Sequence, residues 1–182
     1  MSVVRAGDGS GGLVPGGQGL VSRVESTPGE RYKVLHLLTG DAAVRTAMEE
    51  YCVNDLQRAL WALPSVDVDV RIPVDQSIET WIAKVKTRQS YLNGILIQSR
   101  GRTGLVCDKC ARNAHPFPAC VRAAGHFGGA CGCCEYQSGR ASCSVRGLPD
   151  KDAEDRARTR GLGGAGGAAG GAEVVDLTGD SD

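Results

Sequence analysis

The chain has 182 residues and a formal net charge of zero, because 21 basic residues balance 21 acidic ones. That length allows one modest domain, and the balanced charge excludes the overall basic character that marks many nucleic-acid-binding proteins. No apolar segment has the position and length of a signal peptide, and none approaches the length of a membrane span. We therefore expect a soluble intracellular protein with no membrane partner.

Both ends of the chain are predicted to be unstructured. Residues 1–30 are rich in glycine and show no helical or alternating apolar period, and residues 149–172 pass from a charged run into a nearly pure Gly/Ala linker. Such segments bury too little apolar surface to offset the entropy lost on ordering them. The folded part is therefore expected between residues 31 and 148, with no internal repeat evident.

The first half of this part, residues 31–97, is predicted to be a small α+β or mostly helical support region. Residues 31–38 are a short mixed run, compatible with a strand or with the start of a helix. Apolar residues at three- and four-residue spacing predict one helix from Asp41 to about Leu63. Cys52 lies on the apolar stripe of that helix, so we expect it to be a core thiol rather than a metal ligand.

Alternation and stop signals define the rest of the support region. Valine and isoleucine alternate with polar residues over 66–74, which predicts a half-exposed strand. A second helix is predicted over 77–92, with Asn93 and Gly94 as its stop signal. Residues 95–97 are then a brief apolar run leading into the cysteine-rich region.

Seven of the eight cysteines fall between residues 107 and 143. Without Cys133, the spacing is C-x2-C-x9-C-x10-C-x2-C-x8-C, and the two C-x2-C pairs can each direct two thiolates at one tetrahedral ion. Zinc takes four such ligands in a closed structural site. Residues 98–148 are therefore predicted to form an irregular, zinc-stabilised cysteine cluster. The predicted ligands are Cys107, Cys110, Cys120, Cys131, Cys134 and Cys143.

Disulfides and redox catalysis are the alternatives to metal binding. Without a secretion signal, eight cysteines favour metal over a disulfide framework, and a redox C-x2-C would be expected in a βαβ unit that the sequence does not indicate. No Ser, His and acid set suggests catalysis, so we expect no catalytic residues and a protein that is not an enzyme. Cys133 is an extra thiol that either competes as a ligand or stays free.

The order of the six cysteines resembles the binuclear zinc cluster of fungal transcription regulators, in which six thiolates hold two ions and two sulfurs bridge them. The opening Cys-Asp-Lys-Cys at 107–110 is also similar to that family. The resemblance implies that Cys107 and Cys131 are the bridging pair and that the protein is a DNA-binding regulator. The family's basic helix between the second and third cysteines is replaced here by residues 111–119, with Arg112 as the single basic residue and with two prolines.

Further motifs accompany the cysteines between about residues 94 and 146. They are Pro116 and Phe117, Cys120 with Val121, Gly129 to Cys131, Tyr136 two positions after Cys134, and Cys143 with Ser144. This combination resembles an uncharacterised family of fungal proteins, and it implies a cysteine-cluster fold without implying an activity. Basic residues exceed acidic ones by six to two between 101 and 147, which is compatible with weak DNA binding.

The last ten residues, 173–182, are a short apolar run among acids behind the flexible linker. They resemble a SUMO-interacting motif, which adds a strand to the exposed sheet edge of a small ubiquitin-like modifier. We therefore expect an interaction protein that binds SUMO or sumoylated partners in the nucleus, with the cytoplasm as an additional location. The residues expected to bind are Val174, Val175, Asp176, Leu177, Asp180 and Asp182.

Overall fold

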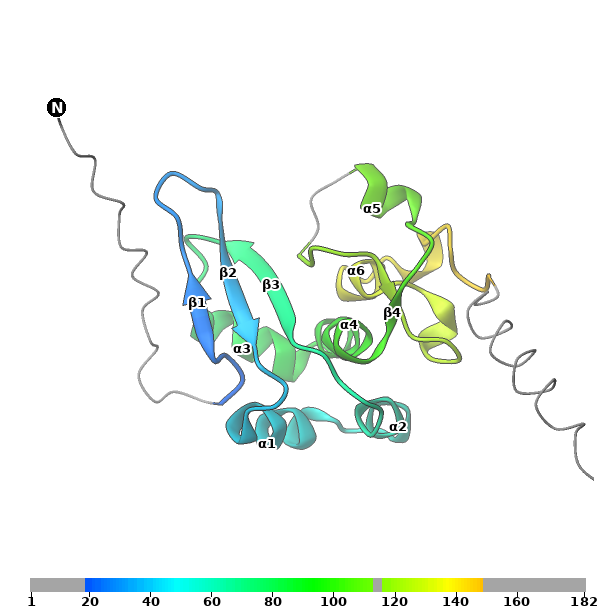
Figure 1. Ribbon diagram of the computed structural model, residues 1–182, viewed down its shortest axis with the longest axis horizontal. Helices are drawn as coiled ribbons and strands as arrows, with labels where there is room; N and C mark the ends of the chain where they lie inside the picture. The colour runs from blue at the N-terminus through cyan, green and yellow to red at the C-terminus, as the bar shows by residue number, and fades with distance from the viewer. Residues whose placement is uncertain (1–18, 113–115, 149–182) are drawn as a thin grey trace, which may run out of the picture. The chain divides into compact units, whose positions relative to one another are not determined.

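The computed structural model describes residues 19–112 and 116–148, so the tail at 173–182 lies outside the described residues. The described part is a mixed α+β fold, as expected, with helices grouped around a small sheet (Figure 1). In chain order its elements are β1 (Arg23–Glu25), β2 (Tyr32–Leu37), α1 (Ala42–Tyr51), α2 (Asp55–Trp61), β3 (Val68–Pro73), α3 (Ile78–Thr87), α4 (Gln89–Arg100), β4 (Arg102–Thr103), α5 (Asp108–Arg112), β5 (Val121–Arg122), the 3-10 turn η1 (Phe127–Gly129), α6 (Gly132–Tyr136) and the 3-10 turn η2 (Arg140–Ser142).

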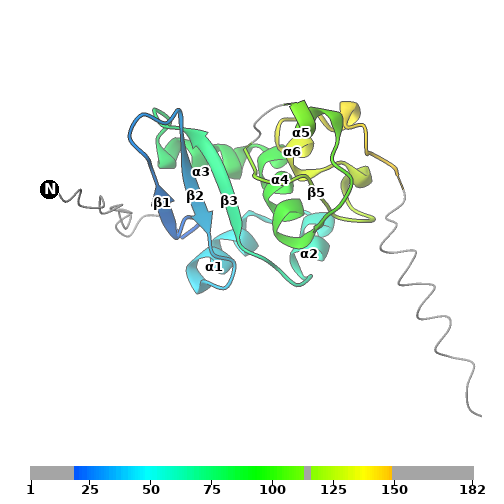
Figure 2. The ribbon, with the colours of Figure 1, turned by 45° about the horizontal axis from the view of Figure 1, so that its top comes forward.

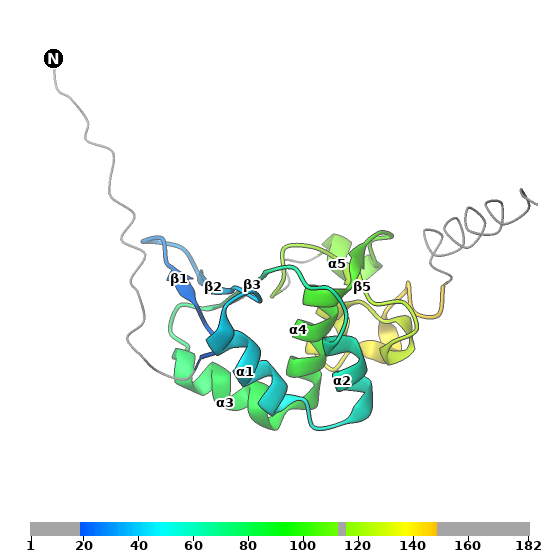
Figure 3. The ribbon, with the colours of Figure 1, turned by 60° about the horizontal axis from the view of Figure 1, so that its bottom comes forward.

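The main sheet is antiparallel in the order β1-β2-β3, and β3 is the edge nearest to the cysteine-bearing segment (Figures 1 and 2). The alternation predicted over 66–74 is present as β3, in which the even-numbered residues are buried and the odd-numbered residues are exposed. Leu35, Val70 and Val24 share the inner face. Figure 3 shows α1 and α3 together on one side of the sheet, where they cover this apolar face.

Strand β1 lies inside the segment predicted to be unstructured. It pairs with β2 from Arg23 opposite His36 to Glu25 opposite Val34, and Leu20 just before it is fully buried. A three-residue strand and one leucine carry no readable period. The backbone ladder with β2 nevertheless satisfies their hydrogen bonds, which is why this short stretch joins the fold.

The single helix predicted from Asp41 to Leu63 is wrong, because two helices, α1 and α2, occupy that range. Asn54 begins α2 with a capping box, in which its side chain accepts from the Gln57 amide and Gln57 bonds back to the Asn54 amide. Because this local cap competes with continuation of the first helix, the helical conformation is interrupted just after Cys52. Cys52 is buried as expected, and burial raises its pKa to about 11.

Helix α4 is the centre of the fold, and the prediction that a helix stops at Asn93 and Gly94 is also wrong. Both residues lie inside α4, and every residue from 92 to 99 is buried. The helix contacts α2, α3, α6, β3 and β5, so it is enclosed rather than amphipathic. Within the described residues, no helix combines the length and apolar character that crossing a membrane requires.

Candidate metal centre

The six cysteines predicted as ligands come from short irregular segments that meet beside α4. Cys107 immediately precedes α5 and Cys110 lies within it, while Cys120 immediately precedes β5. Cys131 is the N-cap of α6, the helix that also carries Cys134. Cys143 follows η2 and completes the set. These elements are too short to be stable alone, so their arrangement depends on what holds the sulfurs together.

The structure brings all six sulfurs into two overlapping groups of four. One group contains Cys107, Cys110, Cys120 and Cys131, and the other contains Cys107, Cys131, Cys134 and Cys143, with the ligand atoms of each group within 4.8 Å of one another. Cys107 and Cys131 belong to both groups, and their sulfurs are 3.7 Å apart. The arrangement therefore offers two four-sulfur sites that share one pair of thiols, and it can hold metal ions.

The two halves of the cluster repeat the same local geometry. In each C-x2-C pair the second amide donates to the first sulfur, at 3.4 Å from Cys110 to Cys107 and 3.5 Å from Cys134 to Cys131. The first amide of each half then donates to that half's last sulfur, Cys107 to Cys120 and Cys131 to Cys143, at 3.5 Å in both. The chain thus contains a three-cysteine repeat that the sequence did not reveal, because x9 and x8 loops of unrelated composition separate the matching positions.

The thiols are crowded and mostly buried, which controls their protonation. Burial, followed by the negative charge of a Cys131 thiolate, raises the pKa of Cys110 and Cys134 well above that of an ordinary thiol. Burial acts in the same direction on Cys107, but hydrogen bonds to its sulfur from the amide and thiol of Cys110 and from Cys134 outweigh it and lower its pKa to about 7. Six neighbouring thiolates require a cation, so metal binding here displaces protons and weakens as pH falls.

No disulfide links these sulfurs, and all eight cysteines are free thiols. The extra thiol, Cys133, is buried on α6 but belongs to neither group of four. Its sulfur lies 3.5 Å from the Ala119 carbonyl oxygen and 3.9 Å from Gln98 Nε2. The structure therefore places Cys133 against backbone and an α4 side chain, as a packed thiol beside the cluster.

Helix α6 is pressed against α4 at a glycine contact. A Cβ atom added to Gly94 would lie 2.6 Å from the Tyr136 Cβ and 2.9 Å from the Gly132 carbonyl oxygen. A Cβ atom added to Gly132 would lie 2.9 Å from the Gly94 carbonyl oxygen. Both helices therefore need glycine at this crossing, and the Asn-Gly pair at 93–94 serves helix packing rather than helix termination.

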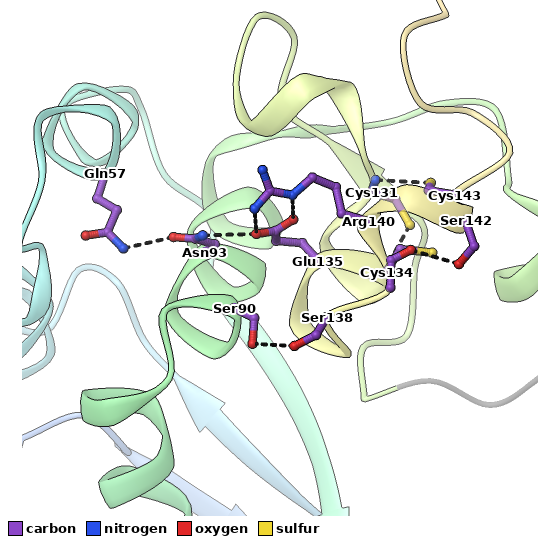
Figure 4. Close-up of polar contacts among 11 residues, drawn as sticks. Gln57, Ser90, Asn93, Cys131, Cys134, Glu135, Ser138, Arg140, Ser142 and Cys143 are labelled. Carbon is purple, nitrogen blue, oxygen red and sulfur yellow. Dashed lines mark hydrogen bonds and ion pairs between the residues drawn. The ribbon is translucent and has the colours of Figure 1, made fainter.

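A buried polar chain joins the cluster to the support region (Figure 4). Glu135, next to Cys134 on α6, has a side chain only 2% exposed. Arg140 donates to both of its carboxylate oxygens, at 2.7 and 3.0 Å, and Asn93 Nδ2 donates to one of them at 3.0 Å. Gln57 Nε2 on α2 donates to Asn93 Oδ1 at 2.8 Å. No local pattern predicts this chain, although Glu135, a lone acid directly after the second cysteine pair, is a visible signal.

Comparison with known proteins gives one match. The family described as "Protein of unknown function (DUF3716)" matches residues 94–146, which is less than a third of the chain. Curated proteins and solved structures gave no match. The matched segment begins inside α4 and ends after Cys143, so it contains the whole cysteine cluster and the α4 turns that pack on it, without α2, α3 or the main sheet.

Proposed function

We propose that the six thiols bind two zinc ions as one bridged cluster, and that the described fold is a binding module held together by this cluster rather than an enzyme. The observation that carries the proposal is the pair of four-sulfur groups that share Cys107 and Cys131. Each group of four contains three sulfurs from one half of the cysteine repeat and one sulfur from the other half. That is the arrangement in which two sulfurs bridge two ions.

The sulfur spacing supports zinc. Four thiolates about 2.3 Å from a tetrahedral zinc ion stand about 3.8 Å from one another. The contacts from Cys107 to Cys131, from Cys107 to Cys134 and from Cys110 to Cys131 are each 3.7 Å. Five of the six sulfurs belong to buried residues and Cys110 is partly buried, which suits a closed structural site with no position open to a substrate.

Purified full-length protein is expected to contain two zinc ions per chain, measured by elemental analysis and native mass spectrometry. Zinc binding should release protons, since the raised pKa values of Cys110 and Cys134 keep those thiols protonated in the metal-free protein at neutral pH. Acidification should accordingly release zinc. One ion per chain, or fully oxidised thiols in protein prepared under reducing conditions, would contradict the bridged cluster.

We also propose that the tail at 173–182 binds SUMO or sumoylated partners, which would place the protein in the nucleus. The support is the sequence alone, in which two valines and a leucine stand among acidic residues at the end of a Gly/Ala-rich linker. The cluster module and the tail would then be two separate recognition elements on one chain.

Binding of a peptide covering the tail to SUMO should be weak, on the order of ten micromolar, because the interface is small and the peptide loses entropy on ordering. Changing Val174, Val175 and Leu177 to Ala should abolish it, since these side chains supply the buried area. Neutralising Asp180 and Asp182 should weaken it and reduce its salt dependence. NMR titration of labelled SUMO is the measurement, and a triple-alanine peptide that binds equally well would exclude the motif.

DNA binding is the second candidate and has less support. Helix α5 ends at Arg112, and Pro116 and Pro118 occupy the described segment before Cys120. The described residues between the second and third cysteines therefore include no long basic helix that would enter a major groove. The exposed arginines near the cluster, Arg102, Arg112 and Arg146, are suited to phosphate contacts, which give salt-dependent binding without sequence preference.

A further inference from the structure

The described residues contain a cavity of about 330 Å³ where the edge of the main sheet meets α4 and α6. This volume is at the small end of the range for ligand sites, roughly 300–1,000 Å³. Its walls come from parts of the chain far apart in sequence: β2 and β3, the start of α4, the end of α6 and the segment at Pro116. Figures 1 and 2 show β3 as the strand that faces α4 and α6.

Aromatic rings and prolines dominate the lining of this cavity. Tyr91 and Tyr136 lie with their ring centroids 4.1 Å apart, and Tyr136 is fixed by a hydrogen bond of 2.7 Å from Trp81 Nε1 to its hydroxyl oxygen. Tyr32 stands at the rim with 47% of its surface exposed, and Pro73 is opposite it in the β2–β3 register. Such rigid, flat surfaces suit the rings of proline and lose little entropy on binding.

Arg71 is the charged residue among those that line the cavity. Arg71 lines it and is exposed, and within residues 19–112 and 116–148 it forms no ion pair. Arg88 is exposed too, with its guanidinium carbon 5.8 Å from the Tyr91 ring centroid. None of the described lining residues is acidic. The electrostatic complement of this rim is a carboxylate-bearing ligand.

The backbone of β3 argues against an added β-strand as the ligand. The Arg71 amide already donates to the Pro116 carbonyl oxygen at 2.6 Å, and Pro73 has no amide hydrogen to donate. Main-chain pairing along this edge is therefore interrupted at both positions. Recognition must come from side-chain surfaces, as it does for peptides in the extended polyproline II conformation, whose backbone needs no sheet partner.

We propose that this cavity, the Tyr32–Tyr136 pocket, binds an acidic, proline-containing peptide segment of a partner protein, with proline rings against the tyrosines and a carboxylate at Arg71. The inference rests on the proposed function, because Tyr136 belongs to the helix that the metal cluster anchors. It adds the chemical class of partner that the module recognises.

The test uses the zinc-loaded full chain and a labelled peptide of repeated Pro-Pro-Glu triplets, followed by fluorescence anisotropy. Binding on the order of tens of micromolar is expected. A Pro-Pro-Lys repeat should fail because of its charge, and a Gly-Ser-Glu repeat should fail because it lacks proline. Tyr32→Ala should weaken binding about tenfold. Arg71→Glu should abolish binding of the acidic peptide and allow binding of the Pro-Pro-Lys repeat.

Arg45→Glu is the matched control, because Arg45 is an exposed arginine on α1 that does not line the pocket. It should bind the Pro-Pro-Glu peptide like the unchanged protein. Equal binding of the Gly-Ser-Glu repeat, no effect of Tyr32→Ala, or no binding of any peptide by the zinc-loaded chain would overturn the proposal. The last result would leave the two-zinc cluster standing, whereas a chain that purifies without metal would overturn the cluster itself.

Discussion

In the proposed two-zinc cluster, replacing Cys107 or Cys131 with serine should prevent both ions from binding, whereas replacing Cys120 or Cys143 should leave one ion bound. The difference follows from the two four-sulfur groups, since Cys107 and Cys131 belong to both while each of the others belongs to one. Structural zinc contributes about 10–16 kcal/mol of apparent binding free energy at neutral pH in small zinc-dependent domains. Losing both ions should therefore unfold the segment from 107 to 143.

Native mass spectrometry of each variant measures the ion count, and Cys133→Ala is the control. Cys133 is buried beside the cluster but outside both groups, so its loss should leave two ions bound. Substitution of cadmium for zinc gives a second readout: NMR should show two cadmium resonances coupled through shared sulfurs. A Cys107→Ser variant that keeps one ion, or uncoupled cadmium signals from the unchanged protein, would mean two separate sites rather than a bridged one.

Arg140→Ala should destabilise the protein by about 3–5 kcal/mol, although the Arg140 side chain is half exposed. The variant would leave the buried Glu135 carboxylate without the Arg140 guanidinium. The hydrogen bond from the Asn93 side-chain amide would remain, but it carries no positive charge to balance the carboxylate. A buried charge without a compensating partner lowers the free energy of unfolding, even where the partner that was removed was partly exposed to water.

The double variant Arg140→Ala with Glu135→Gln should recover part of this loss, because glutamine keeps the shape of the side chain without the charge. Urea unfolding of the unchanged protein, of Arg140→Ala, of Glu135→Gln and of the double variant, with zinc content measured beforehand, gives the four free energies of the cycle. Arg23→Ala is the matched control: its ion pair with Glu25 has both side chains about half exposed, so the change should cost less than about 1 kcal/mol. Equal losses for Arg23→Ala and Arg140→Ala would rule out the buried-charge argument.

The buried polar chain also bears on the limits of the family match. The matched segment, 94–146, contains Glu135 and Arg140 but excludes Asn93 and Gln57, which continue the chain toward α2. It also cuts α4 in its second turn, although α4 packs on the main sheet and on α6 alike. The cluster and the support region therefore share one core, and a fragment limited to 94–146 would expose much of α4 to water.

Local sequence patterns determined several features without help from tertiary structure. The C-x2-C pairs predicted where sulfurs would gather, since two intervening residues form a tight turn whatever surrounds it. Strict alternation predicted β3, and the apolar position of Cys52 predicted a core thiol. Each of these signals depends on neighbours within a few residues, so the sequence alone was enough to read them.

Only the tertiary structure decided the rest, because the deciding contacts join residues far apart in the chain. Helix α4 is buried on all sides and so lacks the one-sided apolar stripe by which a helix is recognised in sequence. Gly94 resembles a helix C-terminal signal in the sequence, but in the fold it is the point where α4 contacts the backbone of Gly132, 38 positions later. The equivalence of the cluster's two halves became visible through amide-to-sulfur bonds and not through residue spacing. Contacts across such distances leave no period in the sequence, and the packed core alone defines them.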